Sequence, residues 1–152
     1  MNWDAIGAVG EIVGALAVFL TLAYLAMQIR QNTKAVQSSA IDSAIGNVSS
    51  ARQAIFENTE MATLYLKGSK EPENLSEVET LQFRLLLHNM LLAVSNMYSQ
   101  TKFTDLPTST WESQKPIIQR IIGSPGGKWF WKMYREEFES EFREEVDSMI
   151  GD

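Results

Sequence analysis

The sequence predicts an all-α protein, with a single N-terminal transmembrane helix followed by a cytoplasmic bundle of four or five helices. An uncharged apolar run lies within the first thirty residues, and later segments carry apolar residues at three- and four-residue spacing. No segment alternates apolar and polar residues as a half-buried strand does. The 152 residues therefore divide into a transmembrane helix with a short tail, 1–30, and a cytoplasmic helical domain, 31–152.

The apolar run extends from Ile12 to Ile29, eighteen residues without a formal charge. A spanning helix needs about 20 mostly apolar residues, with a range of about 17–25. Trp3 and Tyr24 would lie ~31 Å apart along a helix that rises ~1.5 Å per residue. That separation matches the hydrocarbon thickness, with an amphipathic ring at each interface. We therefore expect membrane lipid to surround this segment.

The charges beside the run argue against a cleaved signal peptide and predict an orientation. A signal peptide carries positive charge before its apolar run, whereas here Asp4 precedes the run and Arg30 and Lys34 follow it. A buried helix of a soluble protein is the other alternative, but this run is apolar all round rather than along one stripe. The positive-inside rule then predicts a single-pass inner-membrane protein with its N-terminus outside and its body in the cytoplasm.

Three glycines punctuate the run and predict a contact between helices. Gly10 and Gly14 form a GxxxG pair, and Gly7, Glu11 and Gly14 share one helical face. Small residues let helix backbones approach closely in lipid. The four residues are therefore our predicted interface in a homo-oligomer, or with another membrane protein. Glu11 lies either within the membrane or at its surface, and the sequence leaves both open.

Five amphipathic segments follow the apolar run. Thr33–Glu57 is expected to continue the first helix because no proline separates them, and a short helix should end at Gly68. Two capping boxes are predicted to open the next helices, Ser76 with Glu79 and Ser109 with Glu112. The last break is expected at 123–127, before a final aromatic and acidic segment.

The stretch LLLHNMLLAV is apolar on nearly every face, so the third of these segments should be a central helix covered on all sides. His88 lies within it and is more typical of a core residue than of a catalytic base. Adjacent residues do not share a helical face, so we expect Trp129 or Trp131, which flank Phe130, to be partly exposed. His88, Trp111, Trp129 and Trp131 are therefore the candidate contacts with a ligand or partner.

Composition and motifs exclude several classes of function. The net charge is −6 and no basic run occurs, which argues against a nucleic-acid partner. Cysteine is absent and His88 is the one histidine, so thiolate and multi-histidine metal sites are excluded. No phosphate loop, dinucleotide fingerprint, EF-hand loop or HExxH motif occurs. We expect no catalytic residue, no cofactor and no metal, and a protein that is not an enzyme.

Both ends of the chain carry a resemblance. The opening MNWDAIGAVGEIVGALAVFLTLAYLAMQIRQNTKAVQ and the ending PGGKWFWKMYREEFESEFREEVDSMI resemble those of a widespread family of short, uncharacterised bacterial proteins with an N-terminal membrane helix. The resemblance implies a membrane-anchored helical protein. It implies no activity for any residue.

Three functions remain open from sequence. The first is a self-associating, non-enzymatic scaffold or modulator in the membrane. The second is a small homo-oligomeric channel lined by the N-terminal helices, with Glu11 and Thr21 on its axis. The third is a membrane-anchored sensor that binds a small ligand near His88 and the tryptophans.

Overall fold

A computed structural model describes residues 2–103 and 106–150, and all its regular elements are helices. No strand occurs in these two ranges, which confirms the all-α class. The chain forms two compact units, Met1–Ser39 and Ala40–Asp152, and each is described by itself.

The first helix, α1, spans Trp3–Glu57 without interruption. The prediction that the apolar run continues into the following amphipathic segment is confirmed. No proline lies between Trp3 and Glu57, so no backbone donor is missing from the helix. Gly46 lowers the helical propensity by only about 1 kcal/mol relative to alanine.

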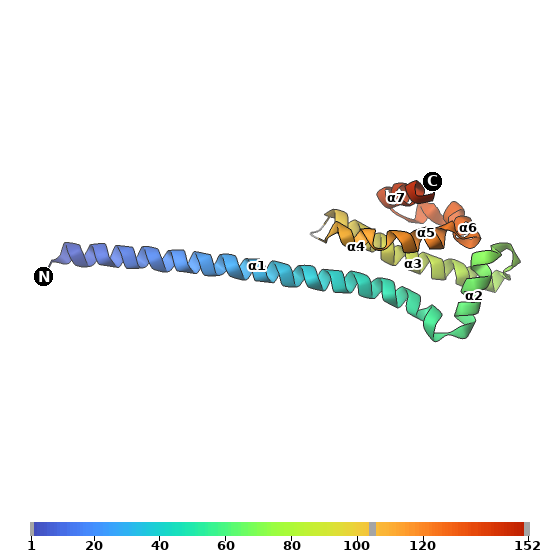
Figure 1. The fold of residues 1–152 in the computed structure, drawn as a ribbon, viewed down its shortest axis with the longest axis horizontal. Helices are drawn as coiled ribbons and strands as arrows, with labels where there is room; N and C mark the ends of the chain where they lie inside the picture. Colours follow the sequence, from blue (N-terminus) through green and yellow to red (C-terminus); the bar gives the residue numbers. More distant parts are fainter. Residues whose placement is uncertain (1, 104–105, 151–152) are drawn as a thin grey trace. The chain divides into compact units, whose positions relative to one another are not determined.

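The second unit contains the end of α1 and a bundle of shorter helices (Figure 1). These are α2 Thr59–Lys70, η1 Pro72–Asn74, α3 Glu77–Phe103, α4 Thr108–Glu112, α5 Lys115–Gly123, α6 Pro125–Tyr134, η2 Arg135–Glu137 and α7 Ser140–Ile150. Pro116 lies where the segment opened by Thr108 is divided into α4 and α5. Proline cannot donate to the preceding turn but is tolerated in the first turn of a new helix, where it lies in α5.

The core of the bundle is built around α3, which contacts α2, α4, α6 and α7. Phe83, Leu87 and Leu91 of α3 are almost fully buried against aromatic side chains such as Phe130 and Phe142. The prediction that this central helix is covered on all sides, however, is wrong. Leu85 and Leu92, which belong to the apolar stretch, are exposed, because within the described part of the second unit no helix packs over them.

One of the two predicted capping boxes is confirmed. The backbone N–H of Ser76 donates to Glu79 Oε2 at 2.7 Å, and the N–H of Glu79 donates to Ser76 Oγ at 3.3 Å. The second is wrong. The helix there begins at Thr108, so Ser109 is already helical, and Glu112 pairs with Lys115 at 2.8 Å instead.

Gly68 and Gly126, predicted to lie at a helix end and in a break between helices, instead lie inside helices. Gly68 lies inside α2, where a Cβ would come within 2.6–2.8 Å of the buried ring of Phe83. Gly126 lies in the first turn of α6, where a Cβ would overlap the carbonyl oxygen of Gly68. The break predicted at 123–127 therefore shrinks to Ser124, whose hydroxyl caps α6 by accepting from the N–H of Gly127. These glycines allow α2, α3 and α6 to approach closely.

Candidate functional site

The N-terminal part of α1 is apolar and uncovered. Within Ile6–Ser50 an 18-residue window has a mean hydropathy of 2.1, and none of that window is buried. By length and composition this helix could cross a membrane, and it is the one such helix in the described ranges. The exposed apolar side chains distinguish it from a core helix, which would be covered by its neighbours.

Polar side chains within this segment find partners on the same helix. The hydroxyl of Thr21 donates to the carbonyl oxygen of Ala17 at 2.8 Å, and Gln28 Nε2 donates to the Tyr24 hydroxyl at 3.1 Å. Such internal bonds are what an apolar environment requires, because lipid offers no competing hydrogen bonds.

The predicted interface residues Gly7, Gly10, Glu11 and Gly14 all lie exposed on α1. A Cβ added at any of the three glycines would meet no atom within 4 Å, so no contact among the described residues requires glycine there. The small residues would therefore matter only for contacts with something outside this chain. Their role in self-association stays a prediction.

His88 packs at the junction between α3 and the segment that follows η2. Its ring lies 5.4 Å from the ring of Phe138, centroid to centroid, and Nδ1 lies 2.9 Å from Glu137 Oε2. Nδ1 is buried and makes no hydrogen bond among the described residues, so this contact is a close approach of the ring to the carboxylate. The side chain is about one-quarter exposed, so His88 is a partly buried packing residue.

Trp111 lies in the core between α3 and α7. Its ring makes edge contacts with Tyr98 and Phe142, at 4.9 and 6.0 Å between centroids. The indole N–H donates to Glu145 Oε1 at 3.2 Å, and Lys115 Nζ lies 2.9 Å from the same oxygen. Burial raises the pKa of Glu145, but the hydrogen bonds from Lys115 and Trp111 outweigh that effect and hold the pKa below its usual range.

Trp131 is buried and Trp129 is partly exposed. The Trp131 indole N–H donates to Asp147 Oδ1 at 2.8 Å, and Arg135 pairs with the other oxygen at 2.6 Å. The Trp129 ring packs on Phe83 with 6.4 Å between centroids. Of the two tryptophans, Trp129 is the one that retains a surface a ligand or partner could contact.

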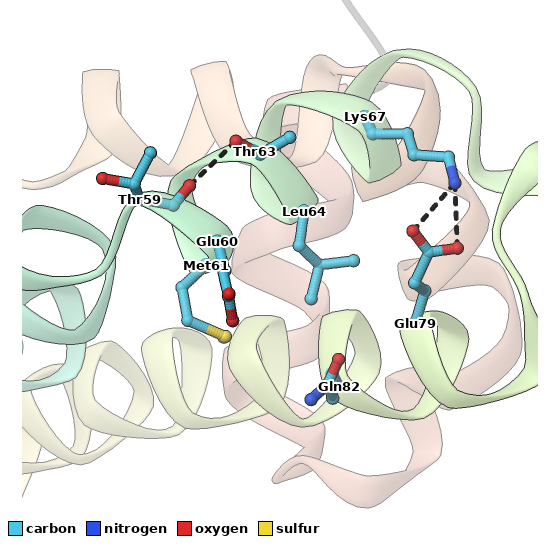
Figure 2. A pocket seen from close by; sticks show the side chains of 8 residues that line it. All are labelled: Thr59, Glu60, Met61, Thr63, Leu64, Lys67, Glu79 and Gln82. Carbon is cyan, nitrogen blue, oxygen red and sulfur yellow. Dashed lines mark hydrogen bonds and ion pairs between the residues drawn. The ribbon is translucent and has the colours of Figure 1, made fainter.

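An open groove of about 330 Å³ lies between α2 and α3 (Figure 2). It is lined by Thr59, Glu60, Met61, Thr63, Leu64, Lys67, Glu79 and Gln82. Figure 2 shows the Lys67 amine directed at the Glu79 carboxylate, with 2.8 Å to each oxygen. The hydroxyl of Thr63 donates to the backbone oxygen of Thr59. The charged pair and the Thr63 hydroxyl in this groove are therefore already engaged within the chain.

No local pattern indicates this groove, because its residues come from two helices that meet where Gly68 packs against Phe83. Within the described ranges, no three histidine or acidic side chains are grouped so that they could hold a metal ion.

In comparisons with protein-family models, curated proteins and solved structures, the chain matches none of them. The family resemblance of the two ends therefore stays a prediction.

Proposed function

We propose that this chain is a single-pass inner-membrane protein that self-associates through α1 and acts as a non-enzymatic scaffold or modulator of a partner. The uncovered apolar window of α1 carries the proposal, because exposing such a surface to water is strongly unfavourable, at roughly 25 cal/mol per Å². Ion pairing of acidic residues in the bundle supports a non-enzymatic role. Glu79, Glu145 and Asp147 are engaged by Lys67, Lys115 and Arg135, respectively.

The proposed topology places the N-terminus outside and the bundle in the cytoplasm, from the positions of Asp4, Arg30 and Lys34. The chain lacks cysteine, so single cysteines report cleanly on exposure. In intact cells, an impermeant maleimide should label Asn2→Cys and leave Ser148→Cys unlabelled until the membrane is opened. Labelling of Ser148→Cys alone would reverse the topology, and recovery of the chain in the soluble fraction would refute the anchor.

Self-association through the glycine face is tested by Gly10→Leu and Gly14→Leu in detergent or nanodiscs. Each substitution blocks close approach of two backbones and should shift a defined oligomer toward monomer. Ala23→Leu, on the opposite side of α1 at helical periodicity, is the matched control and should change nothing. A wild-type chain that is a uniform monomer would contradict the proposal. Ion flux through liposomes that Glu11→Gln alters would support the channel instead.

A further inference from the structure

One face of α3 is exposed and carries no charge. Every exposed residue of α3 from position 78 to position 96 is uncharged, although charged residues make up 21% of the chain. Four are large and apolar, namely Val78 (66% exposed), Leu81 (52%), Leu85 (45%) and Leu92 (40%). The other three are the amides Gln82, Asn89 and Asn96. The face extends ~27 Å at ~1.5 Å per residue.

Exposed charges return at both ends of α3, at Glu77 and Lys102, and they also occur on the other main helices of the bundle. The exposed residues of α2, α5, α6 and α7 include Glu60, Arg120, Lys132 and Glu144, respectively. Surface apolar residues are ordinary when scattered, but a contiguous apolar stripe is typical of an interaction site. The stripe itself carries no lysine or arginine. Arg84 beside it is half-buried with its guanidinium over the ring of Tyr134, and Lys102 lies beyond its end, so no row of free basic side chains flanks it as on an amphipathic helix that binds an anionic lipid surface. A protein surface is therefore the better occupant.

The spacing of the face fits another helix. Val78, Leu81 and Leu85 follow the three- and four-residue spacing of a coiled-coil seam, and Leu92 lies seven residues after Leu85. His88, at the position between Leu85 and Leu92, is partly buried against Phe138 and contributes only its exposed edge. Gln82, Asn89 and Asn96 repeat every seven residues along one edge of that seam. Residues at that edge position set the partner and the orientation in coiled coils.

The amide row favours a second copy of this chain as the partner. An amide side chain both donates and accepts hydrogen bonds, so a row of amides is complementary to itself, whereas a charged row requires the opposite charge. A second copy also carries a net charge of −6, and an uncharged face lets two such chains meet without opposing their acids. We propose that α3 pairs antiparallel with α3 of a second copy, with the two-fold axis at Asn89.

In this arrangement Asn89 lies opposite its own copy, Gln82 lies opposite Asn96, and Leu85 packs beside Leu92 of the other chain. A two-fold contact of this kind is isologous, since each residue and its partner exchange roles across the axis. The proposal extends the proposed function in one respect, because anchoring by α1 would hold the copies in one membrane and raise their effective concentration.

Disulfide crosslinking of the full-length chain in nanodiscs tests the geometry. Asn89→Cys should form a disulfide-linked dimer under mild oxidation. Gln82→Cys alone should not, because its copy would lie ~21 Å away along the helix. Gln82→Cys mixed with Asn96→Cys should crosslink. Leu66→Cys, an exposed position on α2, is the control and should remain monomeric. Crosslinking of Gln82→Cys to itself, or no crosslink at Asn89→Cys, would overturn the proposal.

Charge substitutions test how much the exposed face of α3 contributes to the affinity of the dimer. Leu85→Glu should weaken dimerisation by about tenfold or more, as expected for a central apolar contact. Leu66→Glu, which also replaces an exposed leucine by glutamate, should have no effect. Asn89→Asp changes almost no volume and should weaken the dimer at neutral pH, which separates a lost contact from misfolding. Equal affinities for wild type, Leu85→Glu and Asn89→Asp would refute the α3 contact.

The same assays separate this contact from the glycine face of α1. If Leu85→Glu still weakens dimerisation in a chain that also carries Gly14→Leu, the α3 contact is supported even if the glycine face contributes nothing. If Gly14→Leu weakens self-association but Leu85→Glu and Asn89→Asp do not, the proposed function is supported and the α3 contact is overturned. Protection of Asn89→Cys by empty lipid vesicles, without any dimer, would assign the face to lipid and also overturn it.

Discussion

Lys67 Nζ lies 2.8 Å from both carboxylate oxygens of Glu79, twelve residues further along the chain. The same carboxylate accepts the backbone N–H of Ser76 at the start of α3. One side chain therefore caps α3 and joins it to α2. The hydrogen bond from Lys67, followed by those from Ser76, lowers the pKa of Glu79 from 4.5 to about 2.

This pairing predicts a pH dependence of stability. Because the pKa of Glu79 is lower in the folded chain, its stabilising effect is complete above about pH 4.5 and is lost as the pH falls toward about 2. Glu79→Gln should therefore unfold at a lower temperature than wild type at pH 7, and the difference should shrink between pH 4.5 and pH 2. Thermal unfolding in detergent, followed by circular dichroism, measures it.

Glu73→Gln is the matched control for that experiment, since Glu73 lies nearby in η1 and has no ion pair among the described residues. It should show little change at either pH. A constant difference between Glu79→Gln and wild type across the whole range would contradict the assigned role of the carboxylate.

The glycine at position 126 is predicted to be required for packing. Gly126→Ala places a methyl group against the carbonyl oxygen of Gly68, which belongs to a buried backbone and has little room to move. Overpacking of this kind costs about 1–3 kcal/mol. We expect a lower midpoint in chemical denaturation of the full chain.

Gly46→Ala is the opposite case, because a Cβ there meets no atom within 4 Å and the position is interior to α1. It should leave stability unchanged or raise it by up to about 1 kcal/mol. If Gly126→Ala were as stable as Gly46→Ala, the close approach of α2 and α6 would be wrong.

Trp131 is predicted to stabilise the junction of α6 and α7. Trp131→Phe keeps an aromatic ring but removes the N–H that donates to Asp147. Loss of a hydrogen bond to a charged, partly buried acceptor should cost about 1–2 kcal/mol. Trp129→Phe should cost less, because Trp129 is partly exposed and its indole N–H has no acceptor among the described residues. Equal unfolding midpoints for the two variants would argue against this hydrogen bond.

Membrane insertion is predicted to depend on the centre of the apolar window. Leu20→Arg places a guanidinium where translocon measurements give a cost of about 2.5–3.5 kcal/mol. We expect a larger fraction of the chain to be released by alkaline carbonate extraction of membranes. Gln31→Arg, beyond the apolar run, should remain in the membrane fraction. Release of wild type itself would contradict the anchor, and full retention of Leu20→Arg would exclude the central placement of Leu20.

Local patterns in the sequence determined the helices of this protein. Two of these patterns are confirmed. The apolar run, with no proline after it, lies in the single helix α1, and Ser76 and Glu79 form the capping box at the start of α3. The same local reasoning failed at Ser109 and Glu112, because Lys115 competes for that carboxylate and the helix begins earlier, at Thr108.

Which faces meet was decided only by the tertiary structure. Periodicity defines the faces of α3 but not which of them a neighbour covers, so Leu85 and Leu92 were expected to be buried and are exposed. Gly68 was interpreted as a helix end because its packing partner, Phe83, lies fifteen residues away on another helix. Contacts between distant segments depend on how whole helices fit together, and that fit leaves no signature in a short window of sequence.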